Sequence, residues 1–355
     1  MVIVFEDLSE LIKATHPVKF FEYAASGKPI VSTALPELLP YKSVCSLAHS
    51  HKGYIESLKK ALKESQSLVK KRIEIAKKNT WDMRGTVLER VVQTIMFPKV
   101  SIVVLSYNHA EMTIRCLESI RLRSFYPAIE CIVVDNASHK TEYKKIEKYC
   151  RKNKVQFISN KVNEGFAKGN NIGISKTKGE FIILLNNDTV VTPGWIERLV
   201  FHGQKKHVGI VGPVTNNTGN EMLISLPYNK VSLDGMEDEA LWYTATHWGM
   251  VNEWKVLAAF CWLLPKQVFK KVGKLDERFG QALFEDDDYC VRVKRAGYRL
   301  VGADDVFVHH HGSTSLDEIR KQEYVRLFEK NKAYFEQKWN TIWIPHHLRN
   351  EKRIV

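Results

Sequence analysis

The strongest chemical signal in the sequence is a polar triplet that follows an apolar run. Residues 181–185 read FIILL, which is typical of a buried strand, and Asn186, Asn187 and Asp188 come directly after it. A buried amide or carboxylate is costly unless it is paired. We therefore expect these side chains to face a ligand. The alternative is that Asp188 only caps a helix beginning near Pro193.

A run of four carboxylates is the second signal. FEDDDYC contains Glu285, Asp286, Asp287 and Asp288, just before a helix-like stretch that stops at Gly297. Acidic residues favour a helix N-terminus, and this could account for two of them. Four crowded carboxylates also raise one another's proton affinity, which suits a general base working near neutral pH.

Three histidines form the third signal. HHHGSTS follows the strand-like VFV at residues 306–308. A histidine-rich cluster after a strand is a candidate metal or phosphate site. A purely structural cluster is the alternative.

The elements that must position these groups alternate along the chain. Strand-like runs at 101–106, 130–135, 155–159 and 181–185 are separated by helix-like stretches at 110–121, 141–153 and 165–176. This order is typical of βαβ units in a mostly parallel sheet, where ligands bind beyond the carboxyl ends of the strands. Polar residues end three of these strands. One such end is more often a turn or cap, but three at one edge favour a site.

Composition narrows the class of protein. The 355 residues suffice for two domains, and 53 Lys and Arg against 40 Asp and Glu give a net charge of +13. This charge favours anionic partners such as nucleotide diphosphates, phospholipid surfaces or polyanionic polymers without choosing among them, and the lysines of 59–78 could simply be a solvated face.

Three features of the sequence bear on the cellular compartment of the protein. The start MVIVFEDLSE has acidic residues where an export signal needs positive charge. The apolar run 256–265 has ten residues, half of the ~20 needed to cross a bilayer. The six cysteines form no CxxC pair and are expected to be reduced and buried. We expect a cytoplasmic protein, and a position at the inner face of the membrane stays open.

A change in composition near Phe97 divides the chain. Before it, HPVKFFEYAASGKPIVST predicts a helix, a turn and a short strand, followed by a lysine-rich helical stretch at 55–78. We place a small α/β segment at 1–97, the main domain at 98–316 and a C-terminal helical extension at 317–355.

Six motifs in order carry a family resemblance: VSIVVLSYN, IVVDNAS, NEGFAKGNNIGI, LLNNDTVVTPGW, FEDDDYCVRVKRAGY and HHHGSTS. With them, residues 98–316 resemble the family 2 glycosyltransferases, nucleotide-diphospho-sugar enzymes of the GT-A fold, and especially their rhamnosyl- and galactofuranosyl-transferase-like branch. The resemblance implies a GT-A Rossmann-like α/β domain with a mostly parallel sheet flanked by helices.

The resemblance also implies roles for individual residues. Asp188 ends the family's DxD-like motif, with Asn186 in place of its first aspartate, and would hold Mg²⁺ or Mn²⁺ together with His310 or, as second choice, His311. Asp286 would be the base that deprotonates the acceptor, within an ED-x-D pattern that includes Glu285 and Asp288. The donor-binding residues would be Ser106, Tyr107, Asn108, Asp135, Asn163, Gly165, Lys168, Asn171 and Asn187.

The function expected from these motifs is metal-dependent, inverting transfer of a sugar from a nucleotide-diphosphate donor to a hydroxyl of a glycan or lipid-linked acceptor, in cell-surface polysaccharide synthesis. Peripheral membrane contact stays open and no nucleic-acid partner is expected. One alternative is a sugar-phosphate nucleotidyltransferase, although SYNHAEMT lacks the Gly-rich loop with Arg which that class carries after its first strand. Another is a catalytically silent module that binds polyanions or membranes.

The first 97 residues carry a second resemblance. PVKFFEYAASGKPIVSTALPE is similar to the C-terminal part of a family 4-type GT-B glycosyltransferase, in which Glu22 would match a donor-ribose ligand. Only part of one Rossmann-like half is present. We therefore expect a remnant, or a fragment of a longer tandem enzyme, without catalysis of its own.

Overall fold

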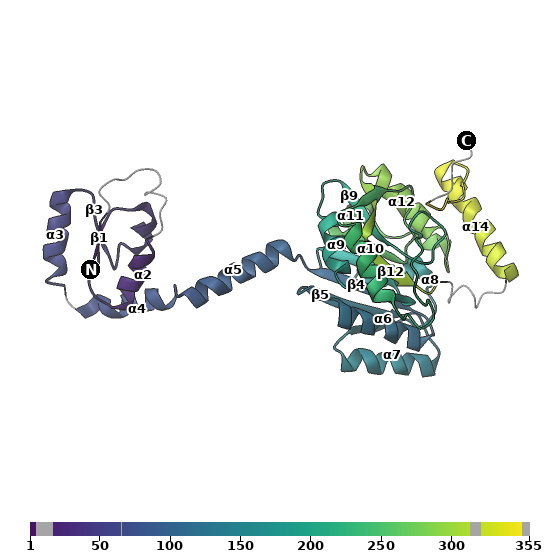
Figure 1. Cartoon of the computed structure of the whole chain (residues 1–355), viewed down its shortest axis with the longest axis horizontal. Coiled ribbons are helices and arrows are strands. Elements are labelled where there is room, and N and C mark those ends of the chain that lie inside the picture. The colour runs from purple at the N-terminus through teal and green to yellow at the C-terminus, as the bar shows by residue number, and fades with distance from the viewer. Residues whose placement is uncertain (5–16, 65, 313–320, 350–355) are drawn as a thin grey trace. The chain divides into compact units, whose positions relative to one another are not determined.

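The structure is a computed structural model that describes residues 1–4, 17–64, 66–312 and 321–349, without the side chains of 90–96 and 321. The chain divides into two compact units, Met1–Val92 and Gln93–Val355 (Figure 1). The expected boundary near residue 316, and the GSTS tail after Gly312, lie outside the described residues. No helix among the described residues is long and apolar enough to cross a membrane.

The smaller unit contains a three-stranded parallel sheet. Its strands are β1 (Val2–Ile3), β2 (Val31–Thr33) and β3 (Ser46–Ala48), in that order. The helices are α2 (Val18–Ala25), α3 (His51–Ala61), α4 (Val69–Lys77) and α5 (Trp81–Met96), with 3-10 turns η1 (Pro36–Tyr41) and η2 (Gln66–Leu68). The lysine-rich stretch is therefore two helices. Phe20, Ile30 and Leu38 lie in the core.

The larger unit is built on a nine-stranded sheet. Its strands are β4 (Val100–Ser106), β5 (Ile129–Asp135), β6 (Gln156–Ser159), β7 (Phe181–Asn186), β8 (Thr189–Val191), β9 (Val208–Val214), β10 (Val251–Glu253), β11 (Cys261–Pro265) and β12 (Arg299–His310). The order is β10-β12-β9-β11-β7-β4-β5-β6, with β8 beside β12. Strands β6, β5, β4 and β7 run parallel, as do β9 and β12, whereas β11, β10 and β8 run antiparallel to their neighbours.

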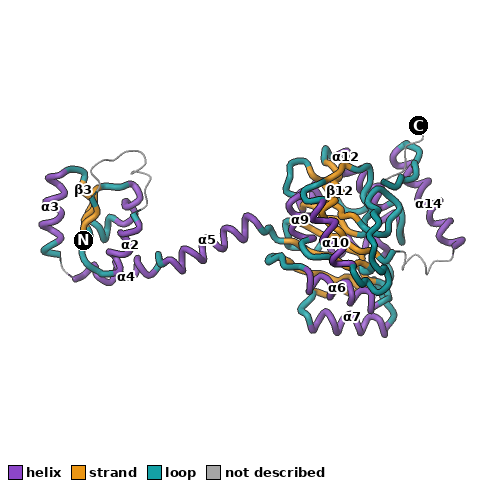
Figure 2. The backbone as a smooth tube through the Cα atoms, in the orientation of Figure 1, coloured by secondary structure: helices purple, strands orange, loops and turns teal. Residues whose placement is uncertain are grey.

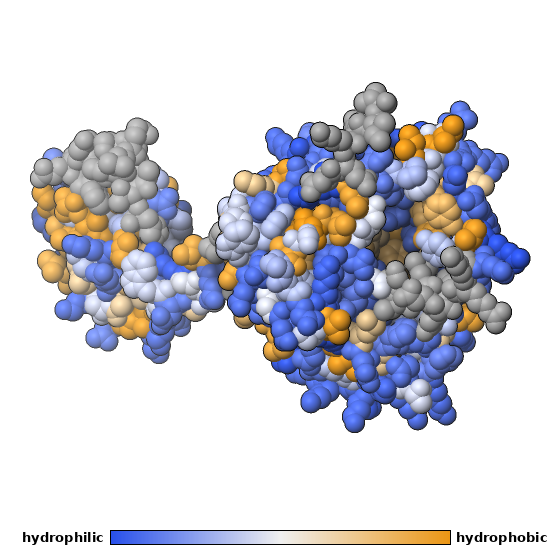
Figure 3. Space-filling model, turned by 45° about the vertical axis from the view of Figure 1, so that its right-hand side comes forward, coloured by the Kyte–Doolittle hydropathy of each residue, from blue (hydrophilic) through white to orange (hydrophobic). Residues whose placement is uncertain are grey.

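Helices flank this sheet (Figure 2). They are α6 (Ala110–Arg123), α7 (Lys140–Lys152), α8 (Gly165–Ile174), α9 (Trp195–Gly203), α10 (Met236–Thr246), α11 (Lys266–Val272), α12 (Glu285–Arg295) and α14 (Lys321–Trp339), with a 3-10 turn η3 (Glu277–Phe279). The predicted α/β domain, with its mostly parallel sheet, is confirmed. On the face shown in Figure 3, hydrophilic side chains predominate and hydrophobic ones are scattered among them.

The strand register brings the polar strand ends together. Ser106 at the end of β4 is opposite Asp135 at the end of β5, and Leu105 is opposite Asn186 at the end of β7. Most residues of the three central strands are buried, as is typical of a parallel sheet with helices on its faces. The polar residues that end them therefore reach the carboxyl edge of the sheet together.

Two glycines of α8 have a packing role. A Cβ at Gly169 would collide with Leu105, and one at Gly173 would collide with Val103. They let the helix lie close against β4 and β5. Gly165, the glycine expected to contact the donor, differs from these two because it lines the cavity described below and has φ +75°.

Candidate active site

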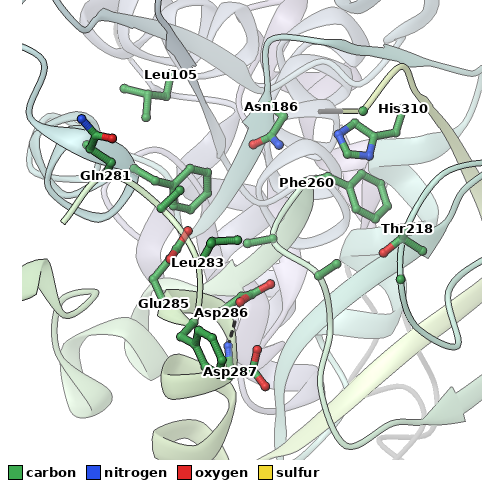
Figure 4. A pocket seen from close by; sticks show the side chains of 18 of the residues that line it. Leu105, Asn186, Thr218, Phe260, Gln281, Leu283, Glu285, Asp286, Asp287 and His310 are labelled. Atoms are coloured by element: carbon green, nitrogen blue, oxygen red, sulfur yellow. Dashed lines mark hydrogen bonds between the residues drawn. The ribbon is translucent and has the colours of Figure 1, made fainter. Parts of the chain in front are cut away.

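A cavity of about 730 Å³ lies at this carboxyl edge. One side is formed by the ends of β4, β5 and β7, and the other by the first turn of α12 together with α14 and the segment after it. Figure 4 shows Glu285, Asp286 and Asp287 on one side and Asn186 and His310 on the other. The cavity thus brings together groups from all three signals in the sequence.

An asparagine network shapes the part of the cavity near β5. Asn136 donates from Nδ2 to Asn163 Oδ1 at 2.7 Å and accepts at Oδ1 from the backbone N–H of Glu164 at 3.0 Å. Tyr107, Asn163 and Gly165 line the cavity, as predicted for donor contacts, and so do Asn136 and Asn187. Asn136 was missed as a site residue, although it directly follows Asp135 in the motif.

Asp135 lies just behind this lining. Its Oδ2 accepts from the Ser138 backbone N–H at 3.2 Å, and its Oδ1 is buried with no hydrogen-bond partner among the described residues. Burial raises the pKa of the carboxyl group, and bonds to Ser138 and Ala137 oppose this. A buried acceptor oxygen that lacks a donor within the protein can accept a hydrogen bond from a ligand, which suits the donor-binding role that the resemblance implies for Asp135.

Four predicted donor residues contact other protein groups and do not line the cavity. Ser106 Oγ lies 2.8 Å from Thr113 Oγ1, and Asn108 Oδ1 accepts from the His139 N–H at 2.9 Å. Lys168 forms an ion pair with Glu164 at 2.5 Å. Asn171 donates to the Leu275 carbonyl at 3.0 Å. These contacts order the turns behind the site, and the donor-binding role of the four residues stays a prediction.

Asp188 and His310 form the candidate cation site. His310 Nε2 lies 3.4 Å from Asp188 Oδ1, and the other ring nitrogen, Nδ1, lies 2.9 Å from the Asn217 carbonyl. That carbonyl can only accept, so Nδ1 carries the proton and Nε2 faces Asp188, as is usual for metal-binding histidines. Phe260 stacks on the ring, with centroids 5.1 Å apart.

The loop after β9 fixes this histidine. Asn216 accepts from the His310 backbone N–H at 2.9 Å and donates to its carbonyl at 3.1 Å. Asn216 and Asn217, which shortly follow the end of β9, were not among the predicted site residues, although they are another polar strand end. Of the two predicted histidines, His310 is the one beside Asp188. His311 does not line the cavity, and its Nδ1 lies 3.3 Å from His309 Nε2.

The side chains at this site suit a cation that also binds the phosphates of the substrate. No group of three or more His, Cys, Asp or Glu side chains in the described part of the chain is arranged to hold a metal by itself. One carboxylate and one imidazole are present, and Mg²⁺-like cations commonly bind one or two carboxylates together with phosphates and water. The two side chains therefore fit Mg²⁺ or Mn²⁺ bound jointly with a diphosphate.

The acidic side begins at an unusual backbone turn. Phe284 has φ 73°, and α12 starts directly after it. Asp286 accepts from the Asp287 N–H at 2.9 Å and lines the cavity, while Glu285 Oε2 is buried without a hydrogen-bond partner among the described residues. Burial and the neighbouring carboxylates raise the pKa of Asp286 to about 7 and that of Glu285 to about 8. Both carboxyl groups therefore hold a proton at higher pH than an ordinary carboxyl group does.

The C-terminal segment holds the other two carboxylates. Asp287 accepts from Trp343 Nε1 at 3.1 Å and lies 3.2 Å from His346 Nε2. Asp288 is fully buried outside the cavity lining, where it accepts from Arg292 Nε at 2.9 Å, from Trp339 Nε1 at 3.1 Å and from Lys338. This corrects the expectation that Asp288 acts on substrate, because its oxygens are engaged away from the cavity.

Comparisons with known proteins relate the central part of this chain to one family. Residues 101–273 match the family model described as Glycosyl transferase family 2. The central part of the larger unit is therefore similar to the family 2 glycosyltransferases, in agreement with the resemblance carried by the sequence motifs.

The similarity to individual relatives is low and covers only part of their length. The chain is 27% identical over 273 residues to Uncharacterized protein y4gI of Sinorhizobium fredii, covering 74% of this chain and 28% of that protein. It is 26% identical over 263 residues to O-antigen biosynthesis protein RfbC of Myxococcus xanthus, covering 70% and 20%. The chain thus spans under a third of these relatives. A crystal structure of GalNAc-T7 with UDP, GalNAc and Mn²⁺ aligns with a TM-score of 0.49 and 18% identity, covering 68% of this chain and 50% of that one.

Proposed function

We propose that the protein is a metal-dependent, inverting glycosyltransferase that moves a sugar from a nucleotide-diphosphate donor to a hydroxyl group. The observation that carries the proposal is that one cavity is shared by Asp188 and His310 on its sheet side and by Asp286 on its helical side. A candidate cation site and a candidate base facing one space suit displacement of a diphosphate by a hydroxyl group.

Asp286 is assigned as the general base. Its carboxylate takes the proton of the acceptor hydroxyl as that oxygen attacks the anomeric carbon, and its raised pKa makes it an effective base near neutral pH. We assign the proton of this pair to Glu285, because the Asp287 N–H donates to Asp286 and favours its ionised form, whereas Glu285 Oε2 is buried without a hydrogen-bond partner among the described residues.

We place the leaving diphosphate at the sheet side of the cavity, opposite Asp286. Asp188 and His310 would hold Mg²⁺ or Mn²⁺ there, and a bound divalent cation supplies positive charge that stabilises the departing diphosphate. Asn136 and Asn163 position the neighbouring loop, and Asp135 is assigned to the nucleotide base.

Finer assignments rest on motif resemblance and on relatives. The resemblance favours the rhamnosyl- or galactofuranosyl-transferase-like branch, and the printed name of one relative, O-antigen biosynthesis protein, supports a glycan or lipid-linked acceptor in cell-surface polysaccharide synthesis. The net charge of +13 supports peripheral contact with an anionic membrane at its cytoplasmic face. We assign residues 1–97 to a partial GT-B-like segment without catalysis, since only a three-stranded sheet is present among its described residues and Glu22 is exposed.

A panel of nucleotide sugars tests the proposal. Each donor is incubated with the full chain, with and without Mn²⁺, and nucleoside diphosphate release and inversion at the anomeric carbon are measured. We expect one donor to be preferred and release to require the cation. Incorporation of a nucleotide from its triphosphate would instead indicate a nucleotidyltransferase, and binding without turnover would indicate a silent module.

A further inference from the structure

The two sides of the cavity differ in chemistry. The sheet side presents several amides, the His310 imidazole and one carboxylate, that of Asp188, whereas the helical side presents the three carboxyl groups of Glu285, Asp286 and Asp287. Like charges in close contact repel strongly, so a phosphate group is disfavoured beside these carboxylates. The group bound at the helical side should therefore carry no negative charge.

Aromatic side chains complete the helical side. Tyr324 and Phe328 of α14, together with Trp343 just after it, line the same cavity as Asp286. Trp343 is half-buried, and its ring packs edge to face against Phe284 at 5.2 Å and Phe328 at 5.6 Å between centroids. Its indole N–H donates to Asp287 at 3.1 Å. These contacts fix the ring beside the carboxylates and leave part of it exposed to the cavity.

An aromatic ring beside carboxylates matches the chemistry of a sugar ring. The C–H groups of a sugar pack against aromatic faces, whose electron-rich centre attracts them, and sugar hydroxyls donate hydrogen bonds to carboxylate oxygens. Amides and an imidazole, by contrast, suit the polar donor. The aromatic residues lie outside residues 101–273, the part that matches the family model, so this feature belongs to the C-terminal segment of this chain.

We propose that Trp343, with Phe328 and Tyr324, binds the ring of an acceptor sugar without negative charge and presents its hydroxyl to Asp286. This inference rests on the proposed function. In the step it serves, the acceptor oxygen forms a bond to the anomeric carbon as the bond from that carbon to the diphosphate oxygen breaks. The electron pair leaves with the diphosphate, and the hydroxyl proton goes to Asp286.

The test compares Trp343→Ala and Trp343→Phe in the full chain. With methyl glycosides as acceptors, we expect Trp343→Ala to raise the acceptor KM about tenfold, as loss of an aromatic contact does. The affinity for nucleoside diphosphate with Mn²⁺ should not change. Trp343→Phe keeps a ring and loses the N–H, so the acceptor KM should rise less than threefold, or about 0.7 kcal/mol.

Controls separate the possible failures. Trp242→Ala removes a tryptophan that is 66% exposed and lies outside the cavity, so it should leave the acceptor KM unchanged. Equal losses in Trp343→Ala and Trp343→Phe would assign the effect to the bond with Asp287 and overturn the proposal. An unchanged KM in a folded Trp343→Ala protein would overturn it as well.

A binding measurement keeps the inference testable without turnover. Saturation-transfer NMR of methyl glycosides, with nucleoside diphosphate and Mn²⁺ present, should show contact with the wild-type protein and much less with Trp343→Ala. If no nucleotide sugar reacts but this difference is seen, the proposed function fails and the sugar subsite stands. If transfer occurs but the NMR signals of both proteins are equal, the subsite fails and the proposed function stands.

Discussion

The two sides of the cavity are held in place by different forces. On the sheet side, His310 is paired with Thr189 between β12 and β8, and the next backbone N–H, of His311, donates to the Asp188 carbonyl at 2.9 Å. Backbone hydrogen bonds therefore set the separation of Asp188 and His310. On the helical side, the carboxylates of α12 are held by side chains about fifty residues further along the chain, including Lys338 and Trp343.

This difference predicts how each side responds to substitution. A side chain on a paired strand can be changed without moving the backbone that carries its neighbours. A buried carboxylate held by distant side chains loses its charge compensation when one of them is removed. Substitutions on the sheet side should therefore reduce function without lowering stability. Substitutions in α14 should disturb the carboxylates on the helical side.

The largest effect is expected for Lys338→Met. Its ammonium group contacts both Asp276 and the fully buried Asp288, so removing it should lower the free energy of unfolding by about 3 kcal/mol, the lower end for breaking a buried pair. Urea unfolding measures this. Lys330→Met, at an exposed position of the same helix, is the control. Equal stability of the two variants would contradict the view that α14 holds α12.

The next effect concerns the base. Asp286→Asn should slow transfer by ~10² or more while preserving affinity for donor and cation, because the amide cannot take the proton. Glu285→Gln should cost less, since Glu285 is assigned as protonated. Steady-state kinetics and calorimetry measure rate and affinity. If Asp288→Asn abolished turnover in a protein as stable as the wild type, the assignment of the base would be wrong by two residues.

A smaller change is expected on the sheet side. Asp188→Ala should remove the gain in nucleoside diphosphate affinity that Mn²⁺ gives, a loss of roughly tenfold or more, with unfolding unchanged. Calorimetry with and without Mn²⁺ provides the measurement, and Asp238→Ala at an exposed position of α10 is the matched control. A full Mn²⁺ effect in Asp188→Ala would remove the metal role.

The smallest effect is a shift in pH dependence. The base must be ionised, so the rate of transfer should rise with pH through an acid limb near the raised pKa of Asp286, about 7. Burial is the main cause of that raised pKa, Asp287 adds to it, and His346 opposes it. His346→Gln should therefore move the acid limb to higher pH. An acid limb at unchanged pH would show that His346 does not affect the pKa of Asp286.

The sequence by itself determined the central strands and the edge at which they end. Alternating apolar runs and helix-like stretches identified strands β4 to β7, and parallel strands necessarily bring their carboxyl ends to one edge. Tyr107, Asn187 and Asp188 were therefore placed at that edge from local pattern, whereas Asn163 and Gly165, which also line the cavity, were expected from the family resemblance.

Only the tertiary structure decided which neighbouring groups face the cavity. Spacing could not choose between His310 and His311, because the choice depends on the pairing of β12 with β8 and on Asn216 and Asn217 of another loop. Nor could it separate Asp286 from Asp288, since consecutive residues of a helix point in different directions and Lys338 and Trp339 meet only one of them. Contacts between residues far apart in the chain leave no local pattern, because they arise only when the core brings the two segments together.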